Sequence, residues 1–286
     1  MSRFEVTKKA GILGILANLF LFFIKMIVGL LSKSQAMIAD SFNSVGDVFA
    51  SLMTFIGNKI ASHESDEDHN FGHGKAEYIF SMFISISILV IAIKLLYDSS
   101  YSFIANNQVY FSIFSLIVCF ITIGIKLFLY FYTKKLYKKE NNILLKSNML
   151  DHRNDIFLTS GVLVSVLFSK FQIYLVDGIV GIIISIWFLL SGIKLFKESY
   201  NVLMDVSLDK ETKDKIIKMI LKEEKVLSVD DIHSVSVGYK YIVVLTISVK
   251  GSLDTFTSHQ IANLIENKIE MAFDNLKEVF VHINPV

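Results

Sequence analysis

Two pairs of oxygen-bearing side chains stand out within long apolar stretches of the sequence. Asn43 and Asp47 are four residues apart in "SFNSVGDVF", and Asp151 and Asp155 repeat that spacing in "NMLDHRNDIF". Residues at i and i+4 of a helix lie on the same face, so the oxygens of each pair can converge on one ion. Two helices that each present such a pair would form a four-ligand cation site between them.

Each pair also has an interpretation that involves no ion. An asparagine within a membrane often only hydrogen-bonds a neighbouring helix, and a carboxylate near a helix end can simply face water. Ionisable residues at bilayer depth are costly, however, and by default they mark functional sites. Because two separate segments share one spacing, we favour the cation site.

Membrane-spanning helices are expected to position these pairs. The chain of 286 residues is 53% hydrophobic and contains a single proline, which is too apolar for a soluble domain of this length. A helix rises about 1.5 Å per residue, so about 20 apolar residues cross a hydrocarbon core of about 30 Å. Six stretches are long enough to do so, and they cover residues 9–31, 34–60, 77–98, 108–133, 148–168 and 174–197.

Basic residues are unevenly distributed between the two sets of connecting loops. The connections near "LSKSQ", "DSSYSFIANNQ" and "SKFQ" contain only Lys33 and Lys170, whereas the other side contains most of the remaining lysines and arginines near the helix ends. By the positive-inside rule, both termini are cytoplasmic. We therefore expect a multi-pass integral membrane protein, in a plasma membrane of bacterial type.

The composition becomes that of a soluble domain from Asp205 onward. The segments "DKETKDKIIKMILKEE" and "SHQIANLIENKIEMAF" have helical apolar stripes, "YIVVLTISVK" alternates, and "VFVHINPV" is a short strand pattern. The expected order is α-β-β-α-β. The sequence thus predicts a six-helix transmembrane domain over residues 1–204 and a small cytoplasmic α+β domain over residues 205–286.

Charge and cysteine content exclude several classes of function. A net charge of +1, with the basic residues spread along the chain, gives no reason to expect nucleic acid as a partner. The lone Cys119 lies in an apolar run, so neither a disulfide framework nor a thiolate metal site is available. Any metal must be held by histidine, carboxylate or amide groups.

Three motifs give the chain a resemblance that covers most of its length. They are "ADSFNSVGDVFASL", "NFGHGKAEYIFSMF" and "LKSNMLDHRNDIFLTSG", and the Phe-Gly-His-Gly-Lys-Ala-Glu string in the second is the most specific. The chain resembles the cation diffusion facilitators, a family of homodimeric divalent-metal/proton antiporters. That resemblance implies six transmembrane helices, a metallochaperone-like cytoplasmic domain and no enzymatic activity or cofactor. It places the transport site on Asn43, Asp47, Asp151 and Asp155.

The four ligand positions also bear on the choice of metal. One or two of them are histidine in the zinc-type pattern, but none is here. An all-oxygen set suits Mn²⁺ and imidazole suits Zn²⁺, so we expect Mn²⁺, as in the manganese-exporting branch that the sequence resembles. A Zn²⁺ or Fe²⁺ exporter of the same family is the alternative. His152 would reach the ion only if its helix were rotated, because it should point about a third of a turn away from Asp151 and Asp155.

Two further groups match positions that bind metal in relatives. Asp66, His69 and His73 in "HESDEDHNFGHGKAE" match a second site, although a solvated acidic loop is an equal alternative. In the cytoplasmic domain we expect a weak or absent site, because threonine and asparagine are poor replacements for histidine and aspartate. The positions concerned are Asp230, Thr246, His282 and Asn284, with His259 nearby.

Two alternatives from other classes remain. An intramembrane aspartyl protease also places aspartates on two helices, but it would need a Gly-x-Gly-Asp string, and Ser44, Val45 and Gly46 precede Asp47. A membrane metal sensor would bind the ion without transporting it. Uptake of metal driven by a proton gradient separates the sensor from an antiporter.

Overall fold

The computed structural model of the protein describes residues 3–31, 35–105, 113–169, 171 and 175–286. These form two compact units, one of residues 1–62 and 76–200 and the other of residues 63–75 and 201–286. The loop 63–75 is therefore grouped with the C-terminal unit, whereas the sequence predicts one boundary, at residue 205. That single boundary stays a prediction.

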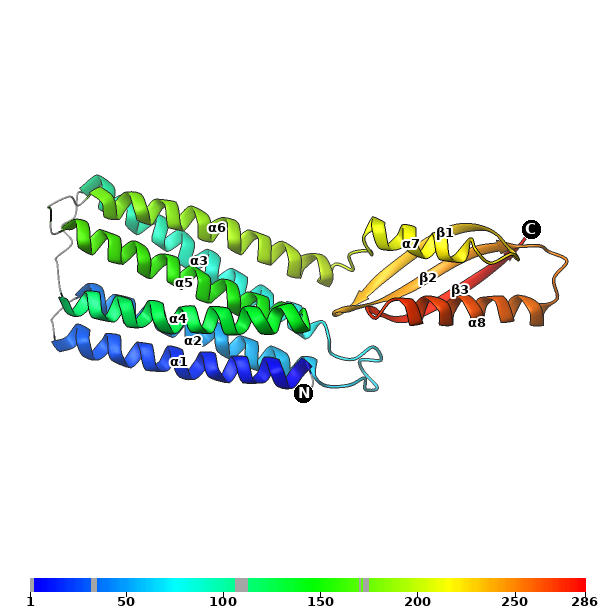
Figure 1. The fold of residues 1–286 in the computed structure, drawn as a ribbon, viewed down its shortest axis with the longest axis horizontal. Helices are drawn as coiled ribbons and strands as arrows, with labels where there is room; N and C mark the ends of the chain where they lie inside the picture. Colours follow the sequence, from blue (N-terminus) through cyan, green and yellow to red (C-terminus); the bar gives the residue numbers. More distant parts are fainter. Residues whose placement is uncertain (1–2, 32–34, 106–112, 170, 172–174) are drawn as a thin grey trace. The chain divides into compact units, whose positions relative to one another are not determined.

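Six long helices that lie side by side make up the first unit (Figure 1). Each coincides with one predicted apolar stretch and extends beyond it at one end or both, because a helix need not end where its apolar residues end. The helices are α1 (Arg3–Leu31), α2 (Gln35–Ala61), α3 (Ala76–Ala105), α4 (Ile113–Glu140), α5 (Ile143–Ser169) and α6 (Leu175–Leu203).

The helical unit has an apolar exterior and a partly polar interior. Large apolar side chains such as Phe23, Phe128 and Leu190 are exposed, whereas Asn18 and Ser51 are fully buried. This distribution suits a bundle surrounded by lipid. Among the described residues, four helical segments are long and apolar enough to cross a membrane, namely Arg3–Val28, Ala76–Ile104, Leu116–Glu140 and Gly178–Leu203.

Small residues allow α3 and α6 to approach each other closely. At Gly181 an added Cβ would lie 2.1 Å from the Ser99 Oγ, and at Gly178 it would lie 2.6 Å from the Phe103 Cβ. Helices in lipid are not driven together by the hydrophobic effect, so their association depends on close van der Waals packing, which small side chains at such crossings permit.

A buried polar network joins one end of three helices. Arg3 on α1 forms a bidentate ion pair with Glu77 on α3, with both nitrogen–oxygen distances at 2.7 Å. The Asn142 amide donates to the same carboxylate at 2.9 Å, and the Asn142 Oδ1 accepts the Leu144 backbone N–H at 2.8 Å. Asn142 therefore caps the start of α5 and fixes it relative to α1 and α3.

The second unit confirms the predicted order of helices and strands. It contains α7 (Lys210–Ile220), β1 (Val226–Val237), β2 (Lys240–Val249), α8 (Thr255–Ala272) and β3 (Leu276–Pro285). The strands form one sheet in the order β1-β2-β3, with β1 antiparallel and β3 parallel to β2. The parallel pair needs a crossover connection, which α8 provides.

The core of this unit lies between the sheet and its two helices (Figure 1). Alternate residues of β2, including Val243, Leu245 and Ile247, are buried against α7 and α8. The opposite face carries Val244 and Thr246. A single strand with one buried face produces the alternating pattern that the sequence showed.

Candidate metal centre

Three of the four predicted ligands meet in the interior of the helical unit. Asp47 on α2 and Asp151 and Asp155 on α5 have exposed fractions of 4%, 6% and 7%. Together with Asn154 they line a cavity of about 10 Å³, whose other walls are apolar side chains of α3 and α6. A cavity of this size holds about one water molecule. The backbone of Asn43 lies in α2, but its side chain lies outside the described residues.

A lysine on a third helix contacts two of these carboxylates. The Lys126 Nζ on α4 donates to the Asp47 Oδ2 at 2.8 Å and also to the Asp155 Oδ2. The Lys126 side chain is only 1% exposed. Burying a charge is costly unless it is paired, so the ammonium and the carboxylates compensate one another. One tethered cation thus bridges α2 and α5.

His152 lies closer to the predicted ligands than its position on a helical wheel indicates. It offers a ring nitrogen that lies, with carboxylate oxygens of Asp151 and Asp155, in a group whose members are all within 4.8 Å of one another. The reason is that α5 packs against α1, α2, α3 and α4, so more than one of its faces is buried. A side chain displaced by about 100° from the ligand face still points into the bundle.

Several polar atoms around the cavity have unused bonding capacity. Both ring nitrogens of His152 and the Asp151 Oδ2 are buried without a hydrogen-bond partner among the residues that the structure describes. Nearly all buried polar groups in proteins have such a partner. A cation held by the group of Asp151, His152 and Asp155 would supply one to the Asp151 oxygen and to a histidine nitrogen.

Sequence reasoning missed two buried lysines. Lys126 lies in the apolar run "GIKLFLYFY", and Lys25 lies in "LFFIKMIVG" on α1, where its Nζ donates to the Ser44 Oγ at 3.2 Å. The rule that identified the aspartates, namely that a charge at bilayer depth marks a functional site, applies equally to these lysines. That signal was present in the sequence.

The structure also brings together the predicted residues of the loop. The Asp66 carboxylate lies 3.2 Å from the His69 Nδ1 and 3.5 Å from the His73 Nε2, and all three residues belong to one candidate ligand group. The His73 Nδ1 also lies 3.3 Å from the Glu64 carbonyl oxygen, which can only accept, so this contact is a hydrogen bond when Nδ1 carries a proton.

Asp66 is held as an anion by its surroundings. The His69 backbone N–H donates to the Asp66 Oδ1 at 2.6 Å and lowers the pKa of the carboxyl, and the nearby imidazoles of His69 and His73 add to that effect. The ring of His63 also lies 5.8 Å from that of His73, centroid to centroid. The loop therefore presents one carboxylate and two imidazoles at an exposed surface.

The candidate metal ligands of the cytoplasmic domain, unlike those of the loop, are not gathered into one group. Asp230 accepts hydrogen bonds from Ser228, Ser248 and Asn284, at 2.6 to 3.2 Å, which lower the pKa of the carboxyl. His282 lies beside Thr246 in the sheet, and His259 contacts Asn263 on α8. Within the described part of the chain, no group of three histidine, cysteine or acidic ligands includes Asp230, His259 or His282.

Comparison with known proteins agrees with this architecture. Residues 11–204 match the cation efflux transmembrane domain, and residues 208–286 match the cation efflux protein cytoplasmic domain. The manganese efflux system protein MneP of Bacillus subtilis is 29% identical over 99% of this chain and 97% of its own length. The cation-efflux pump FieF of Shewanella oneidensis is 27% identical over 98% of this chain and 94% of its own length.

The match of both units to cation efflux domains, together with the buried carboxylates of the bundle, defines the protein as a membrane transporter and not an enzyme. The chain belongs to the cation efflux family, the cation diffusion facilitators, and it exports divalent cations as a homodimer. The interpretation as an intramembrane protease is therefore wrong.

Proposed function

We propose that this protein exports Mn²⁺ from the cytoplasm in exchange for protons, and that Asn43, Asp47, Asp151 and Asp155 form its transport site. The observation that carries the proposal is the convergence of Asp47, Asp151 and Asp155 from two helices on one enclosed cavity. The cavity is small, so a cation bound there would have to shed most of its water. Protein oxygens would then replace that water.

The ligand set favours manganese over zinc. Carboxylate and amide oxygens are hard ligands that suit Mn²⁺, whereas imidazole suits Zn²⁺. Relatives that match the whole chain include two named as manganese efflux proteins. The position of His152 supports a second candidate, Zn²⁺ or Fe²⁺, because an imidazole beside Asp151 and Asp155 would add one borderline nitrogen.

Lys126 gives the empty site an internal counter-charge. Its ammonium occupies oxygens of Asp47 and Asp155 that a metal ion would need, so the ion and the ammonium compete. Three carboxylates against this one bonded ammonium still leave an excess of negative charge. Either a divalent cation or protons can neutralise it, and this choice is the physical basis of exchange between the two.

We propose the same membrane topology as the sequence predicts. All six helices span the membrane, and both termini are cytoplasmic. In support, the six helices are each 27 to 30 residues long, which exceeds the roughly 20 residues needed to cross the hydrocarbon core.

A transport assay tests the proposed function. Purified protein in liposomes with an acidic interior should take up Mn²⁺, as measured with a metal-sensitive dye or a radioactive isotope. The uptake should stop when the pH gradient is collapsed. Liposomes that contain Asp47→Ala protein at equal density are the control. Binding of Mn²⁺ without gradient-driven uptake would instead indicate a sensor, and uptake of Zn²⁺ in clear preference to Mn²⁺ would refute the choice of metal.

A further inference from the structure

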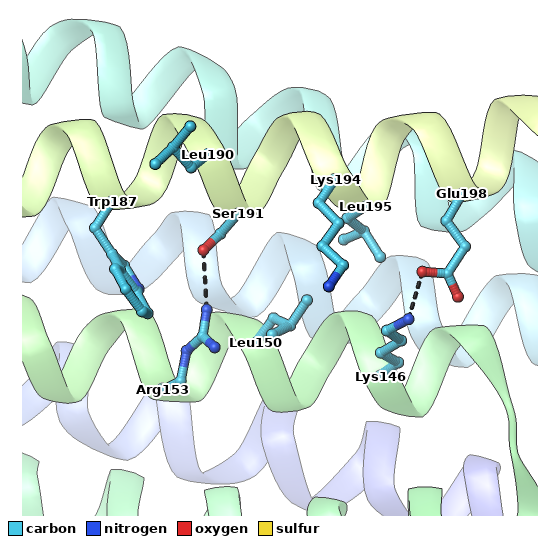
Figure 2. Close-up of a pocket in the computed structure, with 9 residues that line it drawn as sticks. All are labelled: Lys146, Leu150, Arg153, Trp187, Leu190, Ser191, Lys194, Leu195 and Glu198. Carbon is cyan, nitrogen blue, oxygen red and sulfur yellow. Dashed lines mark hydrogen bonds and ion pairs between the residues drawn. The ribbon is translucent and has the colours of Figure 1, made fainter.

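A groove between α5 and α6 has no role in the proposed transport cycle. Figure 2 shows its residues, with Lys194 extending into the space between the two helices. The cavity has a volume of about 260 Å³. Basic side chains line it together with one carboxylate, Glu198, and with the apolar side chains of Leu150, Leu190 and Leu195.

The positive charge of the side chains that line this groove is only partly compensated. Lys146 is paired with Glu198, and the Arg153 guanidinium donates to the Ser191 Oγ at 2.9 Å and lies 5.2 Å above the Trp187 ring. The Arg153 Nε is buried without a hydrogen-bond partner in the described structure. Lys194 likewise forms no ion pair or hydrogen bond with the described residues. Three cations therefore face one carboxylate, and the groove attracts an anion.

A second cavity continues the groove along the same two helices. It has a volume of about 380 Å³, shares Trp187 with the first, and is lined otherwise by residues such as Phe157, Val164, Val180 and Ile183. Along α5 the lining changes from basic at residues 146–153 to apolar at residues 157–164, and α6 changes in the same direction from residue 198 to residue 180. A basic end followed by an apolar end matches a molecule with an anionic head and a hydrocarbon tail.

The predicted membrane spans place the basic end at the membrane surface. Lys146 lies two residues outside the expected span 148–168, and Lys194 lies three residues inside the cytoplasmic end of the expected span 174–197. Arg153 lies about 10 Å deeper than Lys146 at about 1.5 Å per residue. Basic pockets between transmembrane helices on the cytoplasmic side are suited to the phosphate of lipid head groups. The positive charge excludes the transported cation as the occupant.

We propose that the α5–α6 groove binds an anionic phospholipid of the cytoplasmic leaflet. Its phosphate lies among Lys146, Arg153 and Lys194, and one acyl chain follows the apolar cavity beyond Trp187. This site rests on the proposed topology but not on the identity of the transported metal. A second copy of the chain is a poorer occupant, since a symmetric contact across the groove would set the same basic side chains of two subunits against each other.

Trp187 is the only tryptophan of the chain and lies at the junction of the two cavities, so its fluorescence reports on the groove directly. The experiment places the full-length protein in nanodiscs of neutral phosphatidylcholine and adds a small fraction of lipid with brominated acyl chains, which quench tryptophan on contact. Brominated phosphatidylglycerol should quench more strongly than brominated phosphatidylcholine at the same mole fraction. No metal or pH gradient is present, so failure of the transport proposal does not affect the result.

Three variants test which charges set that preference. Lys194→Gln should lower the preference for phosphatidylglycerol about fivefold, the effect of one basic side chain near a lipid surface. Glu198→Gln should raise it, because the substitution removes the one carboxylate among the described residues that line the groove and frees Lys146. Lys197→Gln is the matched control, since Lys197 is exposed on the same helix and does not line the groove.

The outcomes that overturn the proposal are distinct. Equal quenching by the two lipids, or no quenching by either in a folded dimer, would show that the groove does not select an anionic lipid. Equal effects of Lys194→Gln and Lys197→Gln would show that the preference for phosphatidylglycerol comes from general surface charge and not from the groove. Relief of the quenching by millimolar inorganic phosphate, down to the level of phosphatidylcholine, would assign the pocket to a free anion.

Discussion

The Lys126 Nζ on α4 lies 2.8 Å from the Asp47 Oδ2 on α2, at a point where both side chains are almost fully buried. The same ammonium also contacts Asp155 on α5. In a medium of low polarity such a contact holds three helices together while the carboxylates are free of metal. An entering metal ion has to displace the Lys126 ammonium from these two carboxylates.

Replacing Lys126 by methionine should therefore strengthen the binding of metal. Two unit charges about 4 Å apart interact by about 4 kcal/mol near a protein surface, so removal of the competing charge should raise the affinity for Mn²⁺ at least tenfold even after relaxation. Calorimetry on the full-length protein measures this affinity. Transport should nevertheless slow, because a more tightly held ion leaves more slowly.

Lys94→Met is the control for that substitution. Lys94 is an exposed lysine of α3 and does not line the cavity. It should change the affinity for Mn²⁺ much less. If Lys126→Met instead weakens binding as strongly as loss of Asp47, the ammonium is needed to build the site and does not compete with the metal.

The fold could be predicted from the sequence to the level of its elements. Long apolar stretches predicted α1 to α6, and alternation in "YIVVLTISVK" predicted β2. Both patterns can be read from the sequence because contact with lipid, water or the core determines whether each position of an element carries an apolar or a polar residue. Helix ends were less accurate. α4 continues to Glu140 and α6 to Leu203, since the apolar pattern reports the membrane boundary and not the last hydrogen-bonded turn.

The candidate site was predicted only in part. The repeated spacing indicated Asp47, Asp151 and Asp155, which the structure brings together, but it carried no information on what lies opposite them. Lys126 comes from a helix far away in sequence, and the burial of His152 depends on how many helices surround α5. Both are properties of packing, which a pattern within one helix does not contain.

Loss of any predicted carboxylate ligand should abolish transport. Asp47→Ala, Asp151→Ala and Asp155→Ala each remove a direct oxygen contact, so uptake of Mn²⁺ into liposomes should fall at least about 100-fold while size-exclusion chromatography still shows a folded dimer. Asp98→Ala, which removes an exposed carboxylate from α3, serves as the control and should retain activity. Wild-type uptake by folded Asp47→Ala protein would remove α2 from the site.

His152 should contribute to binding of borderline metals. His152→Leu removes the imidazole from beside Asp151 and Asp155, so affinity for Zn²⁺ should fall about tenfold or more and affinity for Mn²⁺ should fall less. Competition between the two ions on the purified variant measures both. An equal loss for the two metals would indicate that His152 supports the helix packing and is not a ligand.

The cytoplasmic domain should dimerise without metal. Its core is formed by α7, α8 and the sheet alone, and the Asp230 carboxylate is already satisfied by three donors, so a metal would have to replace those hydrogen bonds. The fragment 205–286 should therefore be a dimer in chelator, as measured by analytical ultracentrifugation, and bind Mn²⁺ only weakly. Tight stoichiometric binding by calorimetry would contradict this expectation.

Replacing Asp151 by histidine should shift selectivity toward zinc. The substitution exchanges a hard anionic oxygen for a neutral borderline nitrogen, which reproduces the zinc-type ligand pattern. Loss of one carboxylate weakens the attraction for any divalent ion, and Zn²⁺ regains more of it through the imidazole than Mn²⁺ does. The ratio of Zn²⁺ to Mn²⁺ flux, measured for wild type and Asp151→His in matched liposomes, should therefore rise mainly through lost Mn²⁺ transport. An unchanged ratio would mean that the geometry of the cavity or His152, and not the oxygen ligands, determines which metal is exported.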